Sequence, residues 1–253
     1  TTRGFRDVLE IRRFRMPEMY NIRWNKPLPL SPRELRIEVD ERINYKGEIL
    51  QPLDPKQVEA TLDRLVAKGA ESIAVCFLNS YTNPVHEKLV KEIVTRKYPQ
   101  LSVSLSTELI PVIKEYERTS EAVVNAYIKP VVARYLYALQ DTLRQIGVKA
   151  PLLIMQSSGG MMSVGASAEK PIYIIECGPA AGVVGGSFVS RKLDLPNLVT
   201  LDMGGTTTKA SIIENGEMTM SAAYEVGAGI SMASHLTAGG GYVIRVPSID
   251  IAE

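Results

Sequence analysis

The chain has 253 residues, of which 45% are hydrophobic and 23% are charged. This composition is typical of a folded globular protein with enough apolar residues for one large or two moderate cores, and it argues against a disordered chain. The formal net charge is only +1. It gives no electrostatic reason to expect a nucleic-acid partner or an anionic membrane surface.

Cysteine usage and hydropathy indicate the cellular compartment. Cys76 and Cys177 lie in apolar surroundings without the spacing of a metal site or a CxxC motif, so we expect two reduced thiols. No apolar run approaches the roughly 20 residues that cross a bilayer, and no signal-peptide pattern opens the chain. We therefore expect a cytoplasmic protein without membrane contacts. Because the sequence starts without methionine and stops where a strand is expected to begin, we also expect an excerpt of a longer protein.

The first hundred residues predict alternating strands and helices. Proline, glycine and the periodicity of apolar residues mark the boundaries. In chain order, the expected elements are an extended connection over 16–34, a hairpin of 36–43 with 48–50, a helix over 54–69, a strand over 72–77, a helix from 83 and a strand over 101–105. Strands that alternate with helices indicate an α/β layer with at least some parallel pairing.

The middle of the chain predicts a long helix, two strands and a glycine-rich helix. The long helix covers 115–146, and Pro130 is expected to kink or divide it. Strands are expected over 151–155, before a small-residue turn, and over 171–175. The expected apolar stripe of the long helix consists of Val123, Val124, Tyr127, Val131, Tyr135, Leu136 and Leu139.

The helix expected over 180–192 is unusual because glycine costs about 1 kcal/mol relative to alanine at each interior helical site. Its many small residues predict that something packs very close to it. Two interpretations remain open: the neighbour is the backbone of a sheet or helix, or it is a nucleotide that lies across the helix N-terminus.

The most informative segment runs from 198 to 214. An apolar strand ends at Asp202, a glycine and threonine turn follows, and a second strand leads to the hairpin signal Asn215-Gly216. Glycines let backbone amides approach an anion, threonine hydroxyls add donors, and an aspartate can hold a metal-bound water. Because a strand and not a helix follows the glycines, we predict a β-hairpin phosphate clamp and not a Walker loop. The alternative is a tight hairpin without a ligand, in which Asp202 caps the turn.

Three other groups of reactive side chains have plainer interpretations. For Glu117 and Arg118 we favour a surface ion pair at a helix start over a role in a cleft. For His86 and the adjacent Glu87 we favour a structural hydrogen bond over a metal site. Cys177 precedes a helix N-terminus, and we favour an inert thiol over a nucleophile.

Several spaced motifs together resemble one known family. They occur nearly from end to end of the chain, at Thr2–Ile11, Asn79–Glu87, Glu115–Thr119, Val124–Tyr127, Met155–Gly160, Gly178–Val183 and Leu201–Thr206. In this order they resemble the hydantoinase A / 5-oxoprolinase family. One glycine motif alone is weak evidence, whereas the ordered series is specific.

The resemblance implies an α/β actin-like ATPase (ribonuclease-H-like) fold that is incomplete here at both ends. Residues 1–195 would be the remainder of the first half, and residues 196–253 the start of the second. It further implies an ATP- and Mg²⁺-dependent hydrolase that phosphorylates the ring oxygen of a cyclic amide so that water can open it, with a hydantoinase-B-type partner subunit. The alternatives are a subunit of an acetone- or acetophenone-carboxylase type, and a non-catalytic actin-like module.

The resemblance also assigns site residues. Asp202 is the expected catalytic residue and Mg²⁺ ligand. The expected cofactor-binding residues are Gly204, Gly205, Thr206, Thr207, Thr208 and Lys209 in the clamp, with Gly159, Gly160, Gly178 and Gly182 near the cleft. Lys209 stands where many relatives carry an aspartate, which favours direct phosphate contact over metal ligation at that position. The family's first clamp and its adenosine segment have no counterpart in this sequence, so the expected site is half of a nucleotide site.

Overall fold

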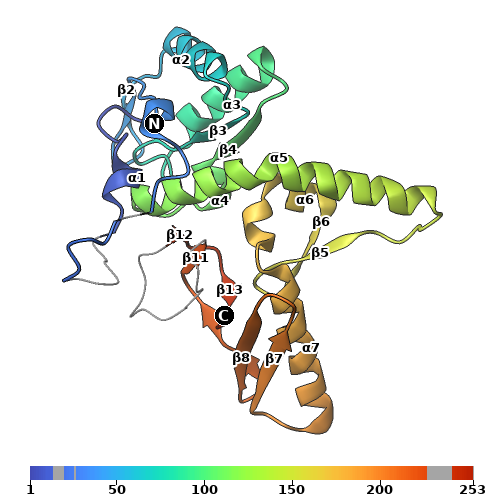
Figure 1. Cartoon of the computed structure of the whole chain (residues 1–253). Helices are drawn as coiled ribbons and strands as arrows, with labels where there is room; N and C mark the ends of the chain where they lie inside the picture. Colours follow the sequence, from blue (N-terminus) through green and yellow to red (C-terminus); the bar gives the residue numbers. More distant parts are fainter. Residues whose placement is uncertain (14–19, 26, 227–240, 253) are drawn as a thin grey trace. The chain divides into compact units, whose positions relative to one another are not determined.

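A computed structural model describes residues 1–13, 20–25, 27–226 and 241–252 (Figure 1). The chain divides into two compact units, residues 1–14 with 27–130 and residues 15–26 with 131–253. Helix α5 (Glu115–Gln145) contributes its first half to the first unit and its second half to the second. The boundary expected near residue 196 concerns the halves of the complete fold, and it stays a prediction.

The first unit is built on a parallel pair of strands. Its elements are α1 (Val8–Ile11), η1 (Arg33–Leu35), β1 (Arg42–Ile43), β2 (Ile49–Gln51), α2 (Pro55–Ala67), β3 (Ser72–Val75), α3 (Val85–Lys97), β4 (Ser102–Leu105), α4 (Ser106–Leu109) and the first half of α5. β3 and β4 pair in parallel, and α3 supplies the crossover that parallel neighbours need. The helices and strands expected between 54 and 105, and the parallel pairing, are confirmed.

Local chemistry sets the ends of helix α2. The carboxylate of Asp54 accepts a hydrogen bond from the amide of Lys56 at 3.0 Å, and Pro55 occupies the first helical position. Gly69, with a φ of 82°, follows the helix in the left-handed region that favours glycine. Val58 and Leu62 of this helix pack with Ile73, Val75, Phe77, Val90, Ile93, Val94, Val103 and Leu105 in the core of the unit.

The structure changes the expectations for the hairpin of the first unit and for helix α5. Of the strand expected over 36–43, β1 alone pairs with β2. Helix α5 continues through Pro130, so the helix is not divided there, and a kink at Pro130 stays a prediction. Its expected apolar stripe is also partly wrong, because Tyr127, Val131 and Tyr135 are each more than 60% exposed. The buried face of its first half carries polar residues instead: Glu117, Arg118, Ser120, Glu121, Asn125 and Lys129.

The second unit contains a three-stranded antiparallel sheet beside a helix. Its elements are the second half of α5, β5 (Leu153–Met155), β6 (Met161–Ser163), α6 (Val164–Glu169), η2 (Pro171–Ile174), α7 (Cys177–Leu193), β7 (Leu198–Met203), β8 (Thr208–Glu214), β9 (Glu217–Met218), β10 (Met220–Ser221), β11 (Tyr224–Val226), β12 (Tyr242–Ile244) and β13 (Ser248–Ile249). Strands β7, β8 and β9 form the sheet in that order, and the figure shows α7 alongside it (Figure 1). The predicted hairpin is confirmed.

The register of β7 and β8 places the strand ends opposite each other, from Leu198 opposite Ile213 to Met203 opposite Thr208. The turn to β9 has positive φ at both Asn215 and Gly216, 52° and 79°. This is the geometry for which the Asn-Gly signal is typical. One face of the sheet packs on α7, while Val199, Leu201, Met203 and Ile212 on the other face are exposed.

The strand expected over 171–175 is the 3₁₀ turn η2. A short apolar run fits a buried strand or a buried helical turn equally well, and Pro171 presets a φ that suits the turn. Helix α7 begins at Cys177, three residues earlier than expected. Gly178 and Pro179 therefore lie in its first turn, and not in a connecting segment.

Close packing explains one glycine of α7. A Cβ at Gly186 would lie 2.5 Å from Cγ2 of Thr200 in β7, whereas Cβ atoms at Gly178, Gly182 and Gly185 would meet nothing within 4 Å. At Gly186 the close neighbour is therefore a side chain of the sheet and not the backbone of a sheet or helix, and a nucleotide across the helix N-terminus stays a prediction. The other three glycines leave open space over the helix.

Candidate functional site

The candidate site is the end of the β7–β8 hairpin. Its turn closes through a hydrogen bond of 3.0 Å from the amide of Gly204 to the carbonyl of Thr207. Gly205, Thr206 and Thr207 are exposed, and their amides donate no hydrogen bond within the described ranges. Three N–H groups without a partner among the described residues, beside threonine hydroxyls, offer the kind of donors that an anion accepts from a turn.

Asp202 and Lys209 lie directly opposite each other at the base of this turn. Side chains alternate between the faces of a strand, so Asp202 shares the α7-facing side with Thr200. The Asp202 residue is exposed. Lys209 Nζ donates to Glu176 Oε2 at 3.2 Å, and both side chains are 18% exposed. A carboxylate, an ammonium group and amides that bind none of the described residues thus occur together at one end of the hairpin.

Glu176 is a site residue that the sequence did not reveal. It occupies the N-cap position of α7, and its amide donates to the hydroxyl of Ser157 at 3.1 Å. Buried Ser157 also binds through its backbone, donating to the carbonyl of Tyr173 and accepting from the amide of Ile249, each at 2.8 Å. Ser157 therefore fixes the start of α7 and the position of the Glu176 carboxylate, which binds Lys209. One indication of this role was present in the sequence, because Ser157 belongs to a small-residue turn at the end of a strand.

A small cavity connects the hairpin to α7. It has a volume of about 70 Å³, and Pro179, Gly182, Asp202 and Lys209 are among the residues that line it. The structure thus places Gly182, Asp202 and Lys209 around one cavity, and their role in nucleotide binding stays a prediction. A side chain at Gly182 would point into open space, so this glycine leaves room beside the hairpin.

The glycines of the β5–β6 turn are positioned by packing and by the turn itself. Gly159 has a φ of 85°, and a Cβ there would lie 2.9 Å from Cγ2 of Val184 and 3.2 Å from Cδ1 of Ile249. Its need for glycine is therefore structural. The carbonyl of Gly160 accepts from the amide of Gln156 at 2.8 Å, which closes the turn. A role for either glycine in nucleotide binding stays a prediction.

A metal ion at this site would have one protein carboxylate at the base of the turn, that of Asp202. Among the described residues no group of three or more His, Cys, Asp or Glu side chains is arranged to hold a metal. Mg²⁺ keeps several waters and often binds through one or two carboxylates together with substrate phosphates. A single aspartate beside a turn with exposed amides fits that mode.

The expected surface ion pair of Glu117 and Arg118 is wrong, because both residues are buried, to 4% and 0% exposure. Glu117 binds Arg13 at 2.7 Å. Arg118 donates to the hydroxyl of Ser106 at 2.9 Å and to the carbonyl of Phe77 at 2.8 Å. A charged pair at a helix start is usually solvated, and nothing in the local sequence shows that the first turn of α5 is buried.

Arg118 belongs to a buried network around Glu87. The two Glu87 carboxylate oxygens accept five hydrogen bonds of 2.7–3.0 Å from Phe77, Ser80, Ser106 and Thr107. Arg118 Nη1 lies 4.0 Å from Glu87 and compensates its charge. The network ties the ends of β3 and β4 to α3 and α5, so its role is structural.

His86 has the structural hydrogen bond that was predicted. Its Nδ1 lies 2.7 Å from Oε2 of Glu41, whose other oxygen accepts from the hydroxyl of Thr2. Cys76 and Cys177 are free thiols, and burial raises the pKa of the Cys76 thiol. The inert character of Cys177 stays a prediction. Across the part of the chain that is described, no helix is long and apolar enough to cross a membrane.

The chain belongs to the hydantoinase/oxoprolinase family. The model of the hydantoinase/oxoprolinase domain matches residues 118–253, and the model of the family's N-terminal region matches residues 1–98. The resemblance found in the sequence motifs is therefore confirmed. Residues 118–253 include the whole β7–β8 hairpin, so the candidate site lies inside the family domain.

Named relatives are similar along the whole chain. An uncharacterized protein of Methanocaldococcus jannaschii is 42% identical over 253 residues, and the caprolactamase alpha subunit of Pseudomonas jessenii is 31% identical over 259 residues. Each match covers 100% of this chain and 37% of the relative. This chain thus spans little more than a third of the length of these relatives.

Two solved structures share the fold. The crystal structure of the ATP-dependent caprolactamase from Pseudomonas jessenii superposes with a TM-score of 0.80 at 30% identity, over 99% of this chain and 35% of that one. A nucleotide-free acetone carboxylase, which carboxylates acetone in an ATP-dependent reaction, gives 0.79 at 25% identity with the same coverage. Both solved proteins with this mixed α/β architecture take part in ATP-dependent reactions.

Proposed function

We propose that this chain supplies one of the two phosphate clamps of an actin-like, ribonuclease-H-like ATPase. The observation that carries the proposal is the β7–β8 turn, in which the amides of Gly205, Thr206 and Thr207 have no acceptor in the described part of the chain and lie next to Asp202 and Lys209. The similarity to two ATP-dependent enzymes supports it. In this proposal residues 1–195 belong to the first half of the fold, and residues 196–253 begin the second.

We assign each group of the turn a part in the reaction. The amides and the hydroxyls of Thr206 and Thr208 bind phosphate oxygens, because oriented donors in a fixed turn stabilise developing negative charge. Lys209 leaves Glu176 to meet a phosphate. Asp202 accepts hydrogen bonds from water, either a Mg²⁺-bound water or the water that attacks. When bound, Mg²⁺ neutralises charge on the phosphates.

The whole protein is proposed to be a hydantoinase/5-oxoprolinase-type hydrolase that opens a cyclic amide. Amide resonance makes direct hydrolysis slow, and transfer of a phosphoryl group to the ring oxygen turns the carbonyl carbon into a good electrophile. The similarity to a caprolactamase supports a cyclic amide as the substrate class. Because that relative is an alpha subunit, we propose a hydantoinase-B-type partner subunit for the complete enzyme.

A second candidate function is an ATP-dependent carboxylase of the acetone or acetophenone type. It is favoured by the likeness to acetone carboxylase, whose TM-score of 0.79 is almost equal to the 0.80 of the caprolactamase. The two candidates differ in one requirement, since only a carboxylase consumes bicarbonate.

The test is ADP release by the whole protein that contains this chain, together with any subunit that co-purifies. Candidate substrates are hydantoin, N-methylhydantoin, 5-oxoproline, caprolactam and a ketone with bicarbonate. Asp202→Ala removes the proposed carboxylate, and Glu214→Ala, at the far end of β8 and exposed, is the matched control. Substrate-stimulated ADP release that disappears only in Asp202→Ala supports the proposal. Release that is absent, or insensitive to Asp202, contradicts it and favours a non-catalytic actin-like module.

A further inference from the structure

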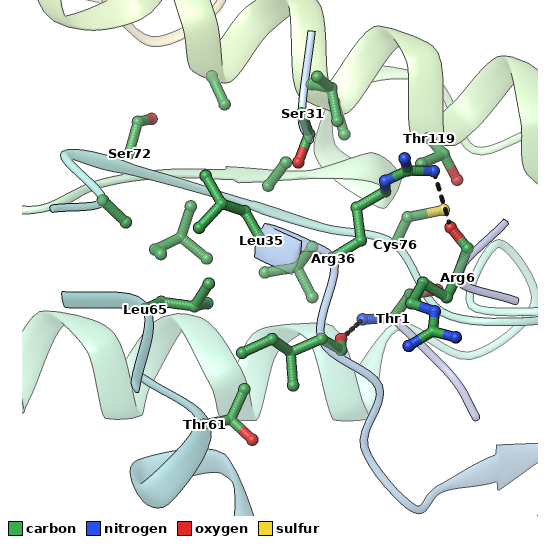
Figure 2. A pocket seen from close by; sticks show the side chains of 18 of the residues that line it. Thr1, Arg6, Ser31, Leu35, Arg36, Thr61, Leu65, Ser72, Cys76 and Thr119 are labelled. Carbon is green, nitrogen blue, oxygen red and sulfur yellow. Dashed lines mark hydrogen bonds between the residues drawn. The ribbon is translucent and has the colours of Figure 1, made fainter. Parts of the chain in front are cut away.

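The ion pair of Glu176 and Lys209 belongs to the candidate site, unlike the pocket of the first unit. That pocket is lined by the first residue, Thr1, and by Arg6 and Arg36 (Figure 2), whose guanidinium groups have carboxylate partners in the chain. Nothing in the proposed reaction requires those pairs to break. Lys209 differs, because the proposed reaction needs its ammonium group at a phosphate, while the structure places it 3.2 Å from Oε2 of Glu176.

The pair joins two elements whose positions are fixed. Lys209 lies in β8, opposite Asp202 of β7. Glu176 directly precedes α7, and its amide donates to the hydroxyl of Ser157 at 3.1 Å. Each side chain of the pair is only 18% exposed, and partly buried charges are screened less by water and salt than surface charges. Separation of the pair therefore has a cost that a surface ion pair would not have.

The carboxylate of Glu176 has a second possible partner at the start of α7. Glu176 is the N-cap residue, yet its side chain makes no capping hydrogen bond to the helix. An N-cap side chain accepts from the second or third helical amide. These positions are Gly178 and Pro179, and proline has no N–H. The amide of Gly178 and the positive end of the helix dipole can therefore stabilise the carboxylate when Lys209 leaves it.

We propose that Glu176 competes with the nucleotide for Lys209. This inference rests on the phosphate clamp of the proposed function and adds how that site is regulated. In the empty site Glu176 binds the ammonium group. When phosphate oxygens reach the turn, the ammonium group moves from the carboxylate to the phosphate, and the carboxylate turns to the amide of Gly178. Glu176 is a positioning residue, since it acts through Lys209 and does not itself bind the nucleotide.

Isothermal titration of the whole protein with Mg²⁺ and AMP-PNP, a non-hydrolysable ATP analogue, tests the competition. Glu176→Gln removes the charge and keeps the size of the side chain and the amide that binds Ser157. We expect AMP-PNP to bind about three- to tenfold more tightly to this variant, because Lys209 no longer leaves an ion pair. Glu214→Gln is the same change at the exposed far end of β8, and its affinity should stay within twofold of the parent. A disturbed fold would lower the affinity, so a purely structural role of Glu176 does not explain a gain.

A Lys209→Met background separates competition from direct repulsion between Glu176 and the phosphates. Competition acts only through Lys209, so Glu176→Gln should change the affinity less than twofold in this background. Repulsion does not depend on the lysine. An equal gain in both backgrounds therefore overturns the proposal.

The competition and the clamp fail in different ways. If the parent binds AMP-PNP and Lys209→Met weakens that binding, while Glu176→Gln leaves the affinity unchanged or lower, the competition is overturned and the clamp stands. If the parent does not bind AMP-PNP, or Lys209→Met binds it as tightly as the parent, both the clamp and the competition are overturned.

Discussion

Replacement of Gly186 by alanine tests how tightly α7 packs on the sheet that carries the candidate site. The added Cβ would lie 2.5 Å from Cγ2 of Thr200, closer than carbon atoms approach in proteins. Overpacking of this kind costs about 1–3 kcal/mol, while alanine in place of glycine gains roughly 1 kcal/mol of helix propensity. We therefore expect a net loss of about 1 kcal/mol in the local stability of α7 and β7.

The neighbouring glycine provides the control. A Cβ at Gly185 meets nothing within 4 Å, so Gly185→Ala should stabilise the same helix by roughly 0.5–1 kcal/mol. Adding Thr200→Ser removes the clashing methyl group and retains the hydroxyl, which donates to the carbonyl of Ser211 at 3.3 Å. In the Gly186→Ala background this second change should restore most of the loss.

Hydrogen exchange of the whole protein, read on peptides from α7 and β7, measures these local free energies without assuming that a multidomain protein unfolds in one step. The expected order of protection is Gly185→Ala above the parent, and Gly186→Ala below it. Equal effects of the two alanines, or no rescue by Thr200→Ser, would refute the packing argument.

Three further predictions concern the first unit and the clamp. Arg118→Met should destabilise the first unit by about 3–5 kcal/mol, because it leaves buried Glu87 without a compensating charge. The control is Arg144→Met, since the ion pair of Arg144 with Asp141 is exposed. This control should change the free energy of unfolding, measured by thermal unfolding, by less than about 0.5 kcal/mol. Hydrogen bonds from Lys97 and Tyr98 lower the pKa of the Asp63 carboxyl in the folded protein, so the unfolded chain binds the proton more readily. The ionised carboxylate therefore stabilises the fold above pH of about 3.9, and this stabilisation is lost as the pH falls through the lower folded pKa. Asp63→Asn should flatten the unfolding profile in that acid range, and a slope equal to that of the parent would count against the assignment. Finally, Lys209→Met should weaken ATP binding by the whole protein at least tenfold, while Lys209→Arg should retain most of the affinity. Equal ATP titration curves for the two variants would exclude a contact between the charge of Lys209 and a phosphate.

Periodicity and end signals in the sequence predicted the elements whose stability is local. Asp54-Pro55 and Gly69 bound α2 as expected, and the Asn215-Gly216 turn has the two positive φ angles that its residues favour. In each case the residue types themselves prefer the observed backbone conformation. The β7–β8 hairpin and the exposed turn of the candidate site were predictable for the same reason.

The expectations that were wrong concern burial and ion pairing, which tertiary contacts determine. The side chains of Tyr127, Val131 and Tyr135 are exposed. Arg118 is fully buried because the carbonyl of Phe77, after β3, and the hydroxyl of Ser106, after β4, accept hydrogen bonds from it. No local pattern encodes those partners, which lie 12 to 41 residues away. The Glu176–Lys209 pair was missed for the same reason, since its members are 33 residues apart.

The most direct test of the clamp is a structure of the whole protein with Mg²⁺ and a non-hydrolysable ATP analogue. The account predicts phosphate oxygens within hydrogen-bond distance, about 2.7–3.2 Å, of the amides of Gly205, Thr206 and Thr207, with Lys209 turned from Glu176 toward them. A nucleotide whose phosphates bind elsewhere, with these amides still in contact with solvent, would contradict it.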